Sequence, residues 1–184
     1  TAPGLATANQ GMDVVTYTGN GGTNNVAGLS FQPDFVWLKR RNLAASHNLF
    51  DSVRGATKFL GADGTNGEQT GSDRLTAFGS NGFTLGSNAE VNNNNDTYVA
   101  WCWKAGGAAV SNTDGTITSQ VSASTDYGFS VTSYTGNNTA GATVGHGLGS
   151  AVKFLIVKSR GQSGQYWHVW HSSLANNEYI YLNA

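Results

Sequence analysis

The chain has 184 residues and a net charge of −1 at pH 7, and only 11% of its residues are charged, against about 25% in ordinary soluble domains. This balance offers no attraction to nucleic acid or to an anionic membrane surface. Gly, Asn, Thr and Ser supply 80 residues, which is typical of an all-β chain with many tight turns. Hydrophobic and aromatic contents of 39% and 11% exclude a disordered chain.

Strand-like runs follow one another along the chain, and turn signals separate them. β-rich or alternating runs predict strands, and Asn-Gly or Gly-Gly pairs mark turns. In the first part of the chain, strands are predicted over residues 12–18, 35–41, 46–52, 58–60, 75–78, 83–85 and 98–104. In the remainder they are predicted over residues 116–122, 129–134, 152–158, 166–170 and 179–182.

About fourteen short strands at this spacing predict an all-β fold, an antiparallel β-sandwich of the jelly-roll or concanavalin A-like kind. No run of 18 apolar residues is present, so neither a transmembrane helix nor membrane insertion is predicted. The single cysteine, Cys102, lies in a strand-like run and is expected to be a small buried hydrophobic residue.

The sequence repeats itself with small changes of spacing. A first copy over about residues 12–106 is followed by a partial second copy over about residues 128–184. We expect equivalent residues to lie in equivalent strands with the same pairing, and Phe35, Trp37, Phe154 and Ile156 to point inward. The matched segments are Tyr17-Thr18-Gly19-Asn20 with Tyr134-Thr135-Gly136-Asn137, Phe35–Lys39 with Phe154–Lys158, Leu49–Ser52 with Val169–Ser172, and Phe59-Leu60 with Tyr181-Leu182.

Two domain arrangements fit this repeat. Residues 1–184 form a single sandwich with an internal repeat, or residues 1–106 form a sandwich and residues 107–184 belong to a following domain. A half sandwich leaves open strand edges and an uncovered apolar face, unless another chain or a continuation of this one covers them. The single sandwich is therefore the preferred arrangement.

The carboxylates do not favour catalysis. A glycosidase of this fold class needs two carboxylates about 5–10 Å apart, and a pair two residues apart on a strand would provide them. No such pair occurs, and Glu68, Glu90 and Glu178 lie in loops or at strand starts. The sequence therefore predicts that the protein is not an enzyme.

Metal ligands are also sparse. His168 and His171 are three residues apart, which places them on opposite faces of a strand. Residues 63–68 and 92–96 are oxygen-rich loops of the composition that Ca²⁺ accepts, although neither has the spacing of a known calcium loop. No cofactor is predicted, because polar loops of this composition are usually only turns, and a structural calcium ion in them is the alternative.

Aromatic residues near the carboxyl end give the strongest binding signal. Neutral sugars are bound by flat aromatic rings beside amide groups, with little charge nearby. Alternation places Tyr166, His168 and Trp170 on one strand face and Trp167 on the other, so the alternative for any one ring is a place in the core. The predicted glycan-binding residues are Tyr166, Trp167, His168, Trp170, Asn176 and Asn177.

Nearly the whole chain resembles a repeat module of bacteriophage tail and fibre-like virion proteins of the marine phage type, which are concanavalin A-like in character. The segments that carry the resemblance are residues 17–20, 31–39, 46–55, 73–86 and 97–107, with residues 129–150 in the second copy. In that family the second copy normally continues, so the resemblance implies that this chain is part of a longer protein.

The resemblance implies a non-catalytic surface or adhesion module of a virion appendage, at the virion surface or otherwise extracellular. Its expected partners are host surface glycans or other virion subunits, with a homotrimer as one assembly and no nucleic acid. The resemblance carries no known catalytic or ligand residues. A free-standing carbohydrate-binding module, a structural spacer and a glycan depolymerase are the alternatives.

Overall fold

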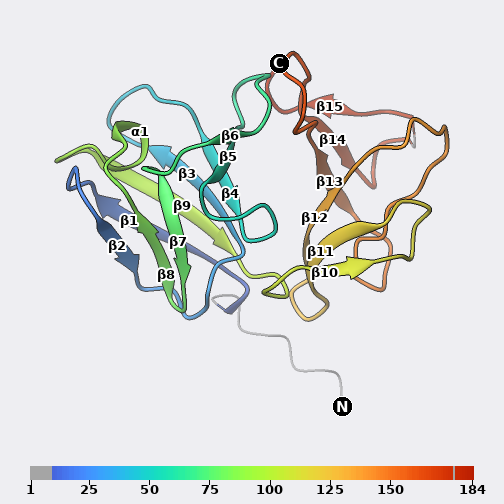
Figure 1. Ribbon diagram of the computed structural model, residues 1–184, viewed down its shortest axis with the longest axis horizontal. Helices are drawn as coiled ribbons and strands as arrows, with labels where there is room; N and C mark the ends of the chain where they lie inside the picture. The colour runs from blue at the N-terminus through green and yellow to red at the C-terminus, as the bar shows by residue number, and fades with distance from the viewer. Residues whose placement is uncertain (1–9, 176) are drawn as a thin grey trace.

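The computed structural model describes residues 10–175 and 177–184, and in them it is an antiparallel β-sandwich protein (Figure 1). Within these residues, α-helix is confined to the single turn α1 (Ala89–Asn92). The predicted all-β class with antiparallel sheets is confirmed. Sequence reasoning missed three short strands, which carry little hydrophobic pattern, namely β2 (Asn24–Ala27), β6 (Gln69–Thr70) and β10 (Val110–Asn112).

The first copy forms a sandwich by itself. Its larger sheet has six strands in the order β1-β9-β3-β4-β5-β6, and its smaller sheet has three in the order β2-β8-β7. The remaining bounds are β1 (Met12–Thr18), β3 (Phe35–Arg40), β4 (Asn48–Asp51), β5 (Lys58–Gly61), β7 (Leu75–Gly79), β8 (Gly82–Leu85) and β9 (Thr97–Trp103).

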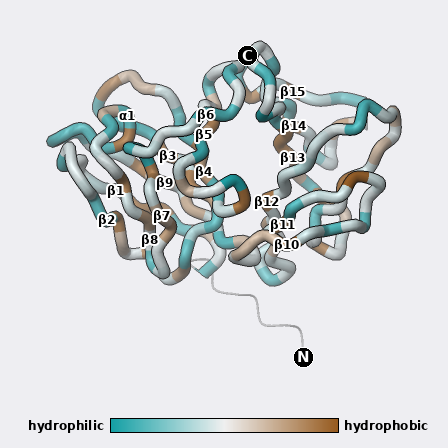
Figure 2. Tube along the Cα trace, viewed as in Figure 1, coloured by the Kyte–Doolittle hydropathy of each residue, from teal (hydrophilic) through white to brown (hydrophobic). Residues whose placement is uncertain are grey.

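The core of this sandwich lies between its two sheets, where hydrophobic stretches of the facing strands gather (Figure 2). Val36 and Leu38 of β3 are fully buried there. Cys102 of β9 is also fully buried, as expected, and burial raises the pKa of its thiol to about 12. Phe35 and Trp37 alternate with the buried pair and face outward, so the prediction that they point into the sandwich core is wrong. β3 is a central strand with apolar residues on both faces, and alternation alone does not say which face meets the core.

The connecting segment and the second copy together form two further sheets. β10, β11 (Ser119–Ser124) and β12 (Phe129–Tyr134) make one three-stranded sheet. β13 (Phe154–Val157), β14 (His168–His171) and β15 (Ile180–Tyr181) make another. The chain is thus a complete sandwich over the first copy, followed by two small sheets.

Strand pairing repeats between the copies in part: β1 pairs with β9, whereas the equivalent β12 pairs with β11, but the next strands pair alike. Val36 of β3 is opposite Phe50 of β4, and 119 and 120 positions later Leu155 of β13 is opposite Trp170 of β14. β4 and β5 also pair as β14 and β15 do. This second pairing corrects one match made from the sequence, because Leu49 opposite Leu60 becomes Val169 opposite Ile180. Phe59-Leu60 therefore corresponds to Tyr179-Ile180.

The repeated lysines have the same contact in both copies. Nζ of Lys39 donates to the carbonyl oxygen of Ala45 at 2.7 Å. Nζ of Lys158 donates to the carbonyl oxygen of Gln165 at 3.0 Å. Each lysine thereby closes the loop that connects its strand to the next, which explains why the basic residue returns at the same strand end.

The two copies meet on the outer face of the six-stranded sheet. Trp167, in the loop before β14, is buried there against Leu49, Leu60 and Ala62. Phe35, Trp37 and Ile156 pack around this cluster. At the other end of the contact, the Phe129 ring lies 6.0 Å from the centroids of both Phe35 and Trp103.

The motif Tyr17-Thr18-Gly19-Asn20 is a docking point for the turn that leads into β9. The Tyr17 hydroxyl donates to the carbonyl oxygen of Val91 at 2.7 Å. The backbone N–H of Asn20 donates to Oδ1 of the fully buried Asn92 at 3.0 Å. Gly19 is required because a Cβ atom there would lie 2.1 Å from the carbonyl oxygen of Asn93.

Candidate binding surface

Four aromatic side chains form an exposed cluster on β14, β15 and the residues just before them. Tyr166 precedes β14 by two residues, and Tyr179 comes directly before β15. His168 is paired opposite Tyr181, so both rings project from the same face of the sheet. We call Tyr166, His168, Tyr179 and Tyr181 the tyrosine face; all four are exposed, Tyr179 at 52%.

The rings of the tyrosine face support one another. The Tyr166 and Tyr181 centroids are 4.6 Å apart, and the His168 centroid lies 4.9 Å from that of Tyr179 and 5.1 Å from that of Tyr181. The Tyr181 hydroxyl donates to the Tyr179 hydroxyl at 3.5 Å, and this hydrogen bond is the largest cause of a raised pKa at Tyr181. Mutual packing fixes the rings, so binding a flat ligand would cost little side-chain entropy.

Some of the predicted binding residues are exposed in the structure, and others are buried or half-buried. Tyr166, His168 and Asn177 are exposed, and Asn176 lies outside the described residues. The predicted place of Trp167 in the binding surface is wrong, because only 6% of this residue is exposed. Its Nε1 donates to the carbonyl oxygen of Gly61 at 2.8 Å. Trp170 is half-buried, and its Nε1 lies 3.4 Å from the carbonyl oxygen of Ala175.

Sequence reasoning left Tyr179 and Tyr181 out of the predicted site, although both are more central to the cluster than Trp170. The available signal was the period-two spacing of the two tyrosines, which places both on one strand face. Which face is covered depends on Trp167, which enters the contact with the first copy and so leaves the opposite face of β14 to solvent.

The first copy has a hollow at the equivalent place. Ser46, Asn48, Phe59 and Gly61 correspond to the four residues of the tyrosine face, each 120 positions earlier. All four line a hollow of about 240 Å³. In the first copy Asn48 and Phe59 are themselves buried beneath this hollow, whereas the equivalent His168 and Tyr179 of the second copy are exposed.

The hollow is polar and already well hydrogen-bonded. Arg74 lies over the Phe59 ring, with its guanidinium carbon 4.1 Å from the centroid. Nη1 of Arg74 donates to Oδ1 of Asn48 at 2.7 Å and to Oε2 of Glu90 at 2.5 Å. Asp63 also lines the hollow. A ligand here would meet amide and charged groups rather than an apolar wall.

The oxygen-rich loops considered for calcium use their carboxylates on protein donors. Asp96 accepts from Asn42 at 2.7 Å and is also paired with Arg40. Glu68 is paired with two arginines, described below. Across the described ranges, no cluster of three or more His, Cys, Asp or Glu side chains could hold a metal ion. Nor do these ranges contain a helix with the length and hydropathy of a membrane span.

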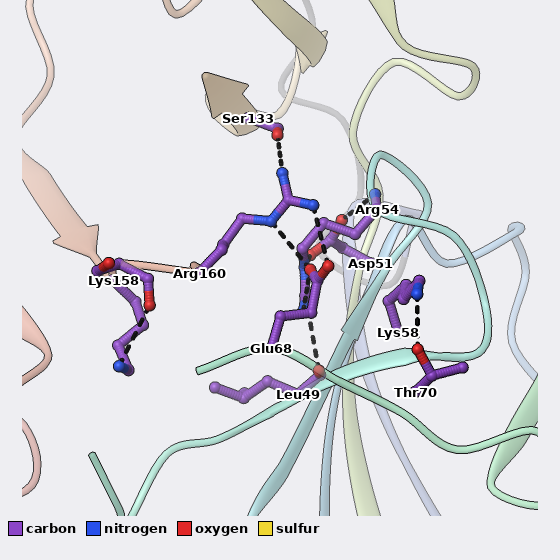
Figure 3. Close-up of polar contacts among 10 residues, drawn as sticks. Leu49, Asp51, Arg54, Lys58, Glu68, Thr70, Ser133, Lys158 and Arg160 are labelled. Atoms are coloured by element: carbon purple, nitrogen blue, oxygen red, sulfur yellow. Dashed lines mark hydrogen bonds and ion pairs between the residues drawn. The ribbon is translucent and has the colours of Figure 1, made fainter. Parts of the chain in front are cut away.

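A polar cluster joins the copies beside the buried Trp167 contact. Both oxygens of Glu68 accept from Arg160, at 2.9 and 3.0 Å. The guanidinium of Arg160 also donates to Oγ of Ser133, as Figure 3 shows. Arg54 approaches Glu68 at 3.4 Å and is paired with Asp51. One carboxylate of the first copy therefore binds Arg160, three residues after β13, and is linked through it to Ser133 of β12.

Lowering the pH should weaken this polar cluster. Burial by itself would raise the pKa of Glu68, but the hydrogen bonds and charges of Arg160 and Arg54 outweigh it, so the pKa lies below its ordinary value. A lowered carboxyl pKa means that the stabilisation is complete above about pH 4.5 and is lost as the pH falls through the folded-state pKa. We expect Glu68→Gln to lower the free energy of unfolding by about 1–3 kcal/mol at pH 7.

The measurement is chemical denaturation of the wild type and Glu68→Gln between pH 7 and pH 3. The difference between the two should shrink as the pH falls. Glu178→Gln is the control, because this exposed carboxylate accepts a local bond from the Ala175 N–H. A difference that stays constant down to pH 3 would contradict the role assigned to Glu68.

Comparison with known protein families identifies the family of this chain. Residues 8–184 match the family described as a domain of unknown function (DUF7483). The chain belongs to this family. The match includes the first sandwich, both small three-stranded sheets and the tyrosine face, so the DUF7483 unit contains both copies as far as residue 184. Comparisons with curated proteins and with solved structures gave no significant match.

Proposed function

We propose that this DUF7483 chain is a non-catalytic surface and adhesion module of a phage-like virion appendage, which binds neutral host glycans through the tyrosine face. The observation that carries the proposal is the set of three exposed, mutually packed tyrosines beside His168, on a chain with little charge to compete. Sugar C–H groups stack on such rings, and phenol, imidazole and amide groups bond the hydroxyls.

The carboxylates support the non-catalytic part of the proposal. Glu68 is held by two arginines, Glu90 by Arg74, and Glu178 by a backbone N–H. Each of the three glutamates therefore already has a structural partner. Carboxylates used in this way fit an adhesion module on the outside of the virion, where several weak glycan-binding sites act together.

The test is glycan binding by surface-immobilised protein against a panel of neutral polysaccharides. Each stacked ring contributes about 1 kcal/mol to the free energy of glycan binding. The double variant Tyr179→Ala/Tyr181→Ala should therefore bind glycan about 30-fold more weakly than the wild type. Its melting temperature should stay within about 2 °C of wild type, because both side chains are exposed. A single weak site of this kind gains strength when several copies act together, as in a homotrimer or a repeat array.

Tyr134→Ala is the matched control. Tyr134 is exposed at 43%, the same fraction as Tyr166, but it lies on β12 away from the tyrosine face. The Tyr134→Ala variant should bind glycans as the wild type does. Equal loss in Tyr134→Ala and in the double variant, or unchanged binding in both, would contradict the glycan site and favour the structural spacer.

A glycan depolymerase is the second candidate, because Asp63 and Glu90 line the hollow of the first copy. It predicts release of reducing ends from a bound polysaccharide and loss of that release in Glu90→Gln. The adhesion module predicts that no reducing ends appear with either protein.

A further inference from the structure

The hollow of the first copy is a polar pocket in a complete sandwich. All of its lining residues lie within positions 46–90, on β4, β5, β6, α1 and the loops beside them. Asn48 of β4 and Phe59 of β5 are buried beneath it. Its volume of about 240 Å³ equals that of about eight water molecules, at about 30 Å³ each in the liquid. The hollow therefore has room for one small ligand.

A glycine keeps the hollow open where the backbone does not require glycine. Gly61 of β5 is paired opposite Asn48, so a side chain at position 61 would project from the same face as that of Asn48. The φ angle of Gly61 lies outside the left-handed region, and the nearest atom to a Cβ there would be Oδ1 of Asp63, at an ordinary 3.6 Å. The equivalent residue of the second copy is Tyr181. Glycine weakens a strand, and it often marks a place where a ligand comes close.

The charged groups around the hollow are each held by the protein through one atom. Nη1 of Arg74 makes the hydrogen bonds of this guanidinium to Asn48 and Glu90, so that Nε and Nη2 remain as donors. Arg74 binds Oε2 of Glu90, which leaves Oε1 as an acceptor. Oδ1 of Asp63 accepts from the backbone N–H of His47 at 3.2 Å, which leaves Oδ2. These side chains are therefore oriented in advance and keep further atoms for a ligand.

Two amide side chains complete the rim of the hollow. Asn66 lies in the loop before β6, and Gln69 lies in β6. Both residues are exposed, and neither side chain is hydrogen-bonded to another described residue. A side-chain amide carries two N–H donors and one acceptor oxygen. The hollow thus presents donors and acceptors of several kinds within a small space.

The balance of charge selects the class of ligand. Arg74 contributes one positive charge, and Asp63 and Glu90 contribute two negative charges. An anionic ligand would be repelled by both carboxylates, and a basic ligand would compete with Arg74 for Glu90. A hydroxyl group is neutral, and it both donates and accepts hydrogen bonds. Neighbouring hydroxyls of a sugar can therefore each donate to a carboxylate oxygen and accept from a guanidinium or amide N–H.

We propose that this hollow is a second glycan site, which binds one neutral pyranose residue through its hydroxyl groups. Neighbouring hydroxyls donate to Oε1 of Glu90 and Oδ2 of Asp63 and accept from the free N–H groups of Arg74. Stacking has little part in the site, because the Arg74 guanidinium already lies over the Phe59 ring. The site is separate from the tyrosine face and does not depend on it.

The first test is an NMR titration of the isotope-labelled chain with neutral hexoses and deoxyhexoses, and with glucuronate and glucosamine as charged comparisons. Neutral sugars should shift the backbone signals of residues 61–69 and the side-chain amide signals of Asn66 and Gln69. Gly61→Tyr should weaken this binding at least tenfold, because the added ring fills the hollow. Gly136→Tyr is the matched control, since a Cβ atom at this glycine would also meet no clash and the position lies outside the hollow.

The second test removes the two rim amides without filling the hollow. The double variant Asn66→Ala/Gln69→Ala should keep the melting temperature of the wild type, because both side chains are exposed. Its affinity for the sugar should fall about tenfold, as expected for two lost hydrogen bonds. Gln120→Ala is the control, because this exposed glutamine lies on β11, outside the hollow. The double variant decides the question if Gly61→Tyr does not fold.

Weaker sugar binding in the hollow variants, with wild-type binding in both controls, would support the site. Three results would overturn it: no shift with any neutral sugar, equal sugar binding in the wild type and the folded hollow variants, or shifts produced only by glucuronate or glucosamine. Tyr179→Ala/Tyr181→Ala should leave these shifts unchanged. Failure of the hollow and failure of the tyrosine face are therefore told apart.

Discussion

Replacing Arg54 with alanine should lower the free energy of unfolding by about 3–5 kcal/mol. The Arg54 side chain is only 5% exposed and is paired with Asp51 and Glu68. Its Nη2 donates to the carbonyl oxygen of Leu49 at 3.0 Å. Alanine would leave the Asp51 carboxylate buried without its cation, and an unpaired buried charge is far more costly than the pair itself is stabilising.

Chemical denaturation at pH 7 measures this loss, and Lys58→Ala is its control. Nζ of Lys58 makes one solvent-exposed hydrogen bond, to Oγ1 of Thr70 at 2.6 Å. Its removal should change the free energy of unfolding by no more than about 0.5 kcal/mol. A loss below about 1 kcal/mol in Arg54→Ala would show that the cluster is not a main support of the fold.

Replacing Trp167 with alanine should also cost about 3–5 kcal/mol, because it removes the largest side chain from the buried contact between the copies. Trp167→Phe should cost less, since a ring remains against Leu49 and Leu60 while the hydrogen bond to Gly61 is lost. The second copy should become looser in Trp167→Ala, which amide exchange in β14 would report.

Tyr179→Ala is the matched control for Trp167, since it removes an aromatic ring from the same small sheet at an exposed position. Its effect on the free energy of unfolding should stay within about 0.5 kcal/mol. Equal effects of the two substitutions would mean that Trp167 does not hold the copies together. A large effect of Tyr179→Ala alone would mean that the tyrosine face is structural.

Two kinds of sequence information predicted the fold correctly. Turn residues and short β-rich runs located most strands, because both depend on local backbone preferences. The repeat predicted that β13 and β14 pair as β3 and β4 do, and the structure has the same register. It misplaced only the last match, where Tyr181-Leu182 was chosen instead of Tyr179-Ile180, since two residues of similarity cannot fix a register.

The sequence by itself therefore determined the strand class, the turns, the two copies and the division of the aromatic residues between two strand faces. Only the tertiary structure decided which face is covered. Phe35 and Trp37 face outward because the second copy packs there, and Trp167 is buried because Leu49, Leu60 and Ala62 lie opposite it. Alternation sorts side chains into two faces, but burial depends on contacts between residues more than a hundred positions apart, which no local pattern records.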